Sequence, residues 1–157
     1  MKTDDVLKAL LRESSQTFVP SGRFAYHYAR GKLASDPIFR ALLQRGVFGP
    51  GGRCLDLGCG QGSLFAWLLA ARSLYERGQW PHGWPAAPAW SRLHGIELMP
   101  RDVKRAGRAF GVDHPLVRIE QGDMNLAPFG QADVITILDA LHYFDFEHQQ
   151  RVLQRIH

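Results

Sequence analysis

The chain has 157 residues, of which 45% are hydrophobic, and this length and composition are typical of one globular domain with its own core. Nineteen Lys and Arg against 15 Asp and Glu give a net charge of +4. The basic residues are scattered along the chain and cluster only mildly, at Arg101, Lys104, Arg105 and Arg108. Because a nucleic-acid site needs a concentrated basic track, this distribution argues against a nucleic-acid-binding protein and indicates a solvated helix face.

No run approaches the roughly 18 to 20 apolar residues of a membrane helix, and residues 1–16 carry acids where a signal peptide would be apolar. The two cysteines, Cys54 and Cys59, have no second pair with which to form a metal site or a disulfide framework. We therefore expect a cytoplasmic protein without a bound metal, in which both thiols are small buried side chains.

Residues 1–50 are expected to form a helical cap. Apolar residues at helical spacing predict a helix over residues 4–12, with Thr3 as its N-cap. A loop is expected over residues 19–32. A second helix is predicted over residues 36–46, because Asp36 can cap it, Pro37 suits its first turn and Gly46 can end it.

From residue 51 onward, apolar strands alternate with helical segments. The predicted strands and helices follow in chain order: 53–57 (strand), 63–75 (helix), 92–98 (strand), 100–111 (helix), 115–123 (strand), 132–140 (strand) and 146–157 (helix). Alternation of this kind predicts a parallel sheet covered by helices on both faces. Residues 51–157 are therefore expected to form a three-layer α/β/α core.

Residues 75–92 form an insertion rich in tryptophan and proline between the first helix and the second strand of this core. Trp80, Trp84 and Trp90 lie among prolines and glycines that disfavour regular structure. Such rings can form a surface for a substrate or a partner, or they can pack back onto the domain. The sequence leaves both alternatives open.

The turn after the first strand reads Asp56-x-Gly58-x-Gly60-x-Gly62. Glycines at a turn between a strand and a helix let the backbone approach a ligand closely, at the carboxyl edge of the sheet. A dinucleotide fingerprint would place its third glycine at position 63, where this chain has Ser63. An NAD-binding oxidoreductase domain is therefore a weaker interpretation.

The acid followed by glycines at alternate positions resembles motif I of the class I S-adenosylmethionine-dependent methyltransferases. The resemblance implies a Rossmann-like fold with seven strands in the order 3-2-1-4-5-7-6. It assigns Asp56, Gly58, Cys59, Gly60 and Gly62 to the cofactor site, with Asp56 binding the methionine amino group through water.

The segments that follow agree with this family in order. By the resemblance, Glu97 accepts hydrogen bonds from the ribose hydroxyls, and Asp123 accepts one from the adenine amine. Met124 and Leu98 cover the adenine ring, and Leu138 also belongs to the cofactor site.

Two further groups complete the predicted site. In the N-terminal cap, Tyr28, Arg30 or Lys32 could reach the methionine carboxylate, and Arg30 is the residue we assign. After the fourth strand, His142 is the candidate general base, with a purely structural histidine as the alternative. Asp139 is a candidate contact to the acceptor.

Tyr143 and Phe144 are expected to form walls of the pocket or part of the core rather than to take part in chemistry.

The resemblance predicts transfer of a methyl group from S-adenosylmethionine to a small-molecule or lipid-like acceptor, which leaves S-adenosylhomocysteine. A non-catalytic S-adenosylmethionine-binding or scaffold module is the alternative. Only the first four strands of the family's fold are recognisable, and residues 133–138 are apolar on both faces, as in a strand from the middle of a sheet. We therefore expect an incomplete form of the fold, lacking the C-terminal strands, or a homodimer in which a second copy covers this edge.

Overall fold

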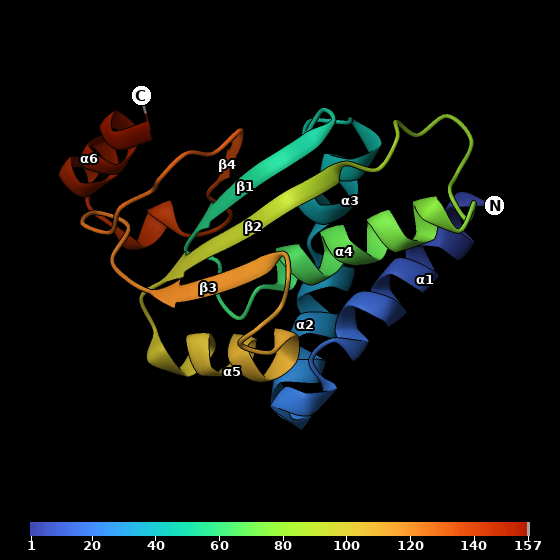
Figure 1. Cartoon of the computed structure of the whole chain (residues 1–157), viewed down its shortest axis with the longest axis horizontal. Coiled ribbons are helices and arrows are strands. Elements are labelled where there is room, and N and C mark those ends of the chain that lie inside the picture. Colours follow the sequence, from blue (N-terminus) through green and yellow to red (C-terminus); the bar gives the residue numbers. More distant parts are fainter. Residues whose placement is uncertain (157) are drawn as a thin grey trace.

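The computed structural model describes residues 1–156 and is built on one parallel sheet with the strand order β3-β2-β1-β4 (Figure 1). The strands are β1 (Gly51–Leu57), β2 (Ala89–Glu97), β3 (Val117–Gln121) and β4 (Val134–Thr136). β1 pairs with β2 on one side and with β4 on the other. The predicted α/β fold and the 3-2-1-4 part of its strand order are confirmed. The reversal of strand order beside β1 leaves a crevice at the carboxyl ends of the strands, where ligands bind in such sheets.

Within residues 1–156, six α-helices and two short 3₁₀ helices surround the sheet. They are α1 (Thr3–Gln16), η1 (Val19–Ser21), α2 (Arg23–Ser35), α3 (Pro37–Gln44), α4 (Ser63–Glu76), α5 (Pro100–Phe110), η2 (Leu141–Tyr143) and α6 (Phe146–Ile156). Among residues 1–156, none of these helices combines the length and apolar character needed to cross a bilayer. The predicted last helix is confirmed as α6, although its final residue, His157, lies outside the described residues.

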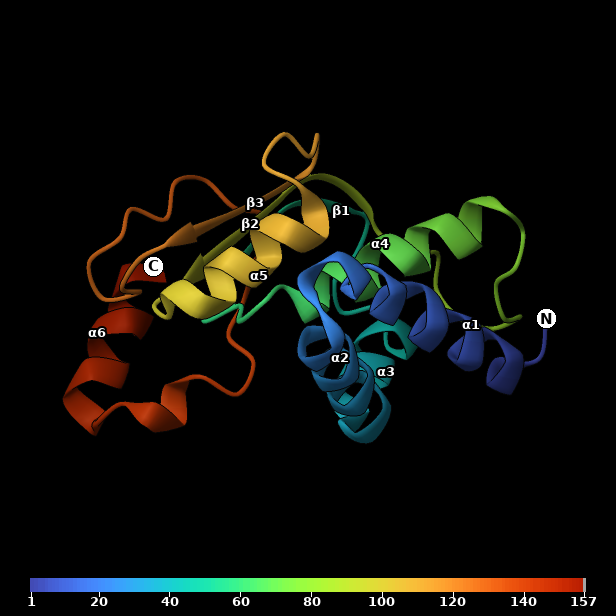
Figure 2. The same ribbon diagram turned by 90° about the horizontal axis from the view of Figure 1, so that it is seen from below.

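The side chains of β1 alternate between two apolar cores on opposite faces of the sheet. Cys54 belongs to the larger core, which contains residues of α1, α3 and α4. Leu55 and Leu57 belong to a second core with Val152 of α6. Figure 2 shows α1, α4 and α5 together beneath the strands, with α6 set apart from them. Helices therefore pack on both faces of the sheet, as predicted.

The predicted loop over residues 19–32 is wrong, because most of this segment forms α2. Ala25, Ala29 and Leu33 recur at intervals of four residues and are all buried. This is the period of a helix that packs one face against its neighbours, and two of the three side chains are small enough for close approach. Gly31 lies within the helix without breaking it, and a Cβ added there would meet nothing within 4 Å.

The boundaries of the other N-terminal helices agree more closely with prediction. Asp36 caps α3, because its carboxylate accepts a hydrogen bond of 3.0 Å from the Ile38 backbone N–H, and Pro37 is the first residue of that helix. α1 is longer than predicted, and Thr3 is its first residue rather than its N-cap.

The third and fourth strands are shorter than predicted. His114 accepts hydrogen bonds from the backbone N–H groups of Leu116 and Val117, which holds the chain in a turn before β3. β4 pairs with only three residues of β1, and Asp139 then takes a positive φ of 57°. Pairing has therefore ended at Thr136, and a backbone in the region of Asp139 cannot resume a strand.

The tryptophans of the insertion pack back onto the domain. Trp80 and Trp84 lie edge to face with ring centroids 5.4 Å apart, and both contact the larger core. The Trp80 indole N–H donates to the Pro85 carbonyl at 2.9 Å. Trp90 is a buried residue of β2, with its ring 5.5 Å from that of Phe48. Of the two alternatives left open by the sequence, the structure has the packed arrangement.

Candidate functional site

The turn between β1 and α4 needs glycine for two different reasons. Gly58 has a φ of 73°, and a Cβ added there would lie 2.6 Å from the Cβ of Ala140. Gly60 has a φ of 57°, and a Cβ added there would meet nothing within 4 Å. At Gly58, Ala140 lies too close for any side chain to fit. At Gly60 the bare backbone faces open space, where a ligand can approach it.

Glu97, at the end of β2, holds this turn in place from a buried position. One carboxylate oxygen accepts a hydrogen bond of 2.7 Å from the Gly60 N–H, and the other accepts one of 2.9 Å from the Met99 N–H. From the opposite side, the buried Gln61 amide donates to the Ala25 carbonyl of α2 at 2.9 Å. The glycine turn is therefore fixed both to the sheet and to the N-terminal cap.

A cavity of about 440 Å³ opens beside the turn, at the carboxyl ends of the strands. The predicted site residues in its wall are Gly58, Gly60, Glu97, Leu98, Met124, Leu138 and Asp139. They come from four separate segments of the chain, so the fold brings together most of what the sequence predicted. The volume lies in the range of small-molecule sites, about 300 to 1,000 Å³.

A much smaller cavity of about 20 Å³ adjoins the larger one behind the turn. Asp56 and Cys59 line it, and Gly58, Gly60 and Leu138 line both cavities. Two residues of α2 are also shared by both walls, Tyr28 and Lys32. The N-terminal cap therefore forms part of the site.

The site is acidic although the chain as a whole carries a net charge of +4. Glu97, Asp102 and Asp139 line the larger cavity, and Asp56 lines the smaller one. Among the described residues in these two walls, Lys32 is the single Lys or Arg. A surplus of carboxylates attracts a positively charged ligand and repels a pyrophosphate.

Asp56 is the most deeply buried acid of the site, with 3% of its surface exposed. Its carboxylate accepts a hydrogen bond of 2.7 Å from the Thr136 hydroxyl. Burial raises the pKa of Asp56 to about 7, although the Thr136 hydrogen bond and the charge of Lys32 lower it. Near neutral pH, this carboxyl is therefore poised to lose its proton when a cation binds beside it.

Four predicted site residues lie outside the walls of both cavities: Gly62, Arg30, Asp123 and His142. Gly62 has a packing role, because a Cβ there would lie 2.7 Å from a ring carbon of Phe110. Asp123 accepts hydrogen bonds of 2.8 and 3.0 Å from the backbone and side chain of Asn125. Its neighbours on either side, Gly122 and Met124, line the larger cavity.

Arg30 and His142 lie at the surface. Arg30 is exposed on α2, whereas Lys32 on the same helix lines both cavities. The His142 side chain is 55% exposed, and its Nδ1 lies 3.4 Å from a carboxylate oxygen of Asp139. Asp139 lines the cavity together with Tyr143 and Phe144, which were predicted as walls.

The sequence interpretation missed Asp102 and Met99 in the cavity wall. Asp102 lies in the first turn of α5 and forms an ion pair of 3.1 Å with Arg105. An acid in the first turn of a helix that begins directly after a strand was the available signal, because such a turn lies at the carboxyl edge of the sheet. Within residues 1–156, no three His, Cys, Asp or Glu side chains are grouped to hold a metal ion.

Both cysteines are expected to resist alkylation in the folded protein. Burial raises the pKa of Cys54 to about 12 and that of Cys59 well above its ordinary value. Because the thiolate is the reactive form, iodoacetamide at pH 8 should leave both residues unmodified in the native state and label both in denaturant, as measured by mass spectrometry. Rapid labelling of Cys59 without denaturant would mean that the glycine turn opens readily.

A family model described as a methyltransferase domain matches residues 55–157. No curated protein sequence matches the chain. The structure is similar to that of an S-adenosylmethionine-dependent methyltransferase from Clostridium acetobutylicum, with a TM-score of 0.55 and 18% identity over 85% of this chain and 50% of that one. It is also similar to a Methanococcus maripaludis protein provisionally assigned to the same class, with a TM-score of 0.53 and 19% identity over 96% of this chain and 57% of that one.

The chain spans between 38% and 57% of the length of the solved structures compared with it. The family match extends over most of the chain, from the first strand onward, and it includes the glycine turn and Glu97. The two structural neighbours, with TM-scores of 0.55 and 0.53, share the fold of this chain, whose sheet is parallel with the order β3-β2-β1-β4. The chain therefore belongs to the methyltransferase domain family and has the Rossmann-like fold of the class I S-adenosylmethionine-dependent methyltransferases.

Proposed function

We propose that the protein binds S-adenosylmethionine in the cavity beside the glycine turn and transfers its methyl group to a small-molecule or lipid-like acceptor, leaving S-adenosylhomocysteine. The observation that carries this proposal is the charge of the site: Glu97, Asp102 and Asp139 line the larger cavity, Asp56 lines the smaller one, and the bare backbone at Gly60 belongs to both. A sulfonium amino acid is positively charged, and this arrangement suits it better than it suits NAD.

Each part of the cofactor has a candidate partner in the chain. Asp56 would attract the methionine ammonium group, and Lys32 replaces Arg30 as the candidate for the carboxylate because it lines both cavities. Glu97 would bind the ribose hydroxyls with its free lone pairs while its hydrogen bonds hold the glycine turn. Met124 and Leu98 would cover the adenine ring, and Asp123 would accept a hydrogen bond from its amine.

The protein's contribution to the reaction would be to align the reactants and exclude water. When bound, the cofactor supplies a methyl carbon that its sulfonium group already activates. Asp139 and Tyr143 line the cavity from the segment that follows β4. They would contact the acceptor. The Asp139–His142 pair, 3.4 Å apart, would hold a proton taken from an acceptor hydroxyl.

The rim of the cavity favours an apolar acceptor. Tyr28, Leu98, Met99 and Tyr143 all line it, and each is between 47% and 79% exposed. Apolar and aromatic side chains left open around a pocket are typical of sites for apolar ligands. This supports a small-molecule or lipid-like acceptor over a polar macromolecule.

The proposal is tested by thermal shift with S-adenosylmethionine, S-adenosylhomocysteine and NAD. Both sulfur compounds should raise the melting temperature by an amount that grows with the logarithm of their concentration above Kd, and NAD should not. Stabilisation by NAD and by neither sulfur compound would contradict the cofactor assignment. Binding without methylation of any acceptor in a library of apolar alcohols, amines and thiols would favour the non-catalytic alternative.

Lys32 and Arg30 offer a matched pair of substitutions on one helix. Lys32→Ala should weaken S-adenosylmethionine binding by about 1 to 2 kcal/mol, roughly tenfold, because it removes the cation that faces both cavities. Arg30→Ala should leave the affinity unchanged, because Arg30 is exposed away from both walls. Isothermal titration calorimetry measures both, and equal losses would indicate a general effect of charge.

Two expectations stay predictions: that a second copy covers the β4 edge, and that the protein is cytoplasmic. Sedimentation equilibrium of the purified chain tests the first. Fractionation of the producing cells tests the second.

A further inference from the structure

The outer edge of the sheet carries a second surface, distant in the chain from the glycine turn. β3 is the last strand on this side, and α5 lies beside it (Figure 1). A groove of about 610 Å³ runs between them, with one wall from residues 103–112 and the other from residues 117–120. The described lining of this groove includes no residue of the cavity beside the glycine turn. Asp102, Glu97 and two glycines of the turn line that cavity and not this groove.

The backbone along this edge is free to pair with another strand. Leu116 and Gly122 bond to β2, through the hydrogen bonds from Leu93 N–H to the Leu116 carbonyl and from Gly122 N–H to the Glu97 carbonyl. In a parallel ladder, alternate residues face the same neighbour. The N–H and C=O groups of Val117, Ile119 and Gln121 therefore point to the open edge, where His114 takes only the N–H of Val117.

The groove is positively charged along its helix side. Lys104 and Arg108 lie one turn apart on α5, are exposed and line the groove. Arg118 reaches it from β3. The single acid of the lining, Glu120, is already engaged by Arg118 at 2.6 Å and by His94 at 2.7 Å. Lys104 and Arg108 therefore give the helix side of the groove a net positive charge, and Arg118 adds a paired cation on the other face of β3.

Apolar side chains lie between these charges. Val103, Phe110 and Ile119 form part of the groove wall, and Val112 beside them is 91% exposed. A strand added to β3 would place alternate side chains against this wall and against the face that carries Arg118. A segment that mixes acidic and apolar residues matches both faces.

We propose that the β3 edge and the flank of α5 bind an extended acidic segment of a partner protein as an added strand. Main-chain hydrogen bonds to Ile119 and Gln121 would fix the segment, and its carboxylates would pair with Lys104, Arg108 and Arg118. A second copy of this edge would bring like charges together. A nucleic acid has no main-chain N–H and C=O ladder, so it would leave the outward carbonyl oxygens of Val117 and Ile119 without donors along this edge.

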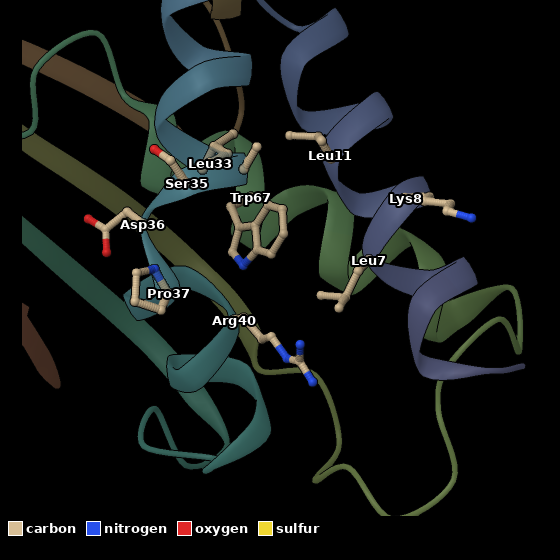
Figure 3. Close-up of a pocket in the computed structure, with 10 residues that line it drawn as sticks. Leu7, Lys8, Leu11, Leu33, Ser35, Asp36, Pro37, Arg40 and Trp67 are labelled. Atoms are coloured by element: carbon tan, nitrogen blue, oxygen red, sulfur yellow. The ribbon is translucent and has the colours of Figure 1, made fainter.

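Fluorescence anisotropy with a labelled peptide that alternates glutamate and valine tests this surface. The double variant K104E/R108E should bind this peptide at least roughly tenfold more weakly than the unmodified chain, because both attractive charges become repulsive. The control K8E/R40E makes the same change of net charge at a different groove, between α1 and α3 (Figure 3). It should bind within about twofold of the unmodified chain.

A second probe tests the strand geometry without altering the protein. The same peptide with N-methyl groups on alternate residues cannot donate hydrogen bonds from those positions, so one of its two methylation patterns should lose binding. Equal binding of both patterns, or of a lysine-valine peptide, would overturn the proposal. So would tighter binding of an oligothymidylate, or a dimer that K104E/R108E dissociates.

Neither of these two binding experiments depends on the methyltransferase proposal. The peptide is titrated without S-adenosylmethionine, and Lys104 and Arg108 line neither wall of the cofactor cavity. The thermal shift caused by S-adenosylhomocysteine should therefore be the same in K104E/R108E as in the unmodified chain. The melting temperature of K104E/R108E without any ligand checks that the variant is folded.

Discussion

Replacing Glu97 by alanine is expected to abolish S-adenosylmethionine binding and to lower the free energy of unfolding by about 1 to 3 kcal/mol. The carboxylate accepts hydrogen bonds from the Gly60 and Met99 N–H groups, and its removal leaves both donors without a protein partner. It also removes the proposed ribose contact and one of the negative charges that attract the cofactor. Calorimetric titration and chemical denaturation measure the two effects separately.

Two other substitutions make this result specific. Glu97→Gln keeps one acceptor oxygen, so its stability should lie between those of Glu97→Ala and the unmodified chain. Glu76→Ala removes an exposed acid that pairs with Arg72 within α4, and should cost less than about 0.5 kcal/mol. If Glu97→Ala bound the cofactor with undiminished affinity, Glu97 would have only the structural role of holding the turn.

The strands and the residues at their carboxyl ends were predictable because they depend on local patterns. A buried strand is a short apolar run, and a parallel sheet brings the ends of its strands to one edge. The glycine turn was placed at that edge from its local pattern, and the resemblance to a family added Glu97 and Met124; Gly58, Gly60, Glu97 and Met124 all line the cavity. The resemblance to a family supplied the strand order, which no local pattern contains.

The N-terminal cap was less predictable because its structure depends on tertiary packing. Tyr26, His27 and Tyr28 do not form an obvious apolar stripe, and the small buried residues Ala25 and Ala29 carry the helical period. Once that period is known, Tyr28 and Lys32 share one face, four residues apart, and Arg30 lies on another. The assignment of Arg30 followed from treating this segment as a loop.

The ends of the last strands were mispredicted for a related reason. An apolar run predicts burial, and the run that begins in β4 continues through Ile137 and Leu138. Pairing with β1 nevertheless stops at Thr136, and Asp139 then takes a positive φ. A non-glycine residue in this conformation stores strain, which is common at functional sites. The departure from regular structure lies where the acceptor is proposed to bind.

The pH dependence of stability is expected to follow Asp56. The ordinary pKa of this carboxyl, 3.8, applies to the unfolded chain, and burial raises the pKa to about 7 in the folded protein. Between these values the folded state holds a proton that the unfolded state has lost. The contribution of Asp56 to the free energy of unfolding should therefore be highest below pH 4, decrease by on the order of 1 kcal/mol per pH unit toward pH 7, and stay lower above it.

Asp56→Asn isolates this contribution, because asparagine has the same shape and does not titrate. Denaturation of both chains between pH 4 and 8 should give a difference that favours the unmodified chain at low pH and the variant near pH 8. Thr136→Val should move the decrease to higher pH, because the Thr136 hydrogen bond lowers the pKa of Asp56. Parallel curves for the unmodified chain and Asp56→Asn would contradict the raised pKa.

The same proton should control affinity for the cofactor. A bound cation favours the Asp56 carboxylate, so the affinity for S-adenosylmethionine should rise by up to about tenfold per pH unit from pH 5 to 7 and then level off. Asp56→Asn should bind weakly with no such rise. An affinity that is independent of pH in the unmodified chain, with full binding by Asp56→Asn, would mean that the ligand's positive charge lies away from Asp56 and that the acids of the larger cavity attract it instead.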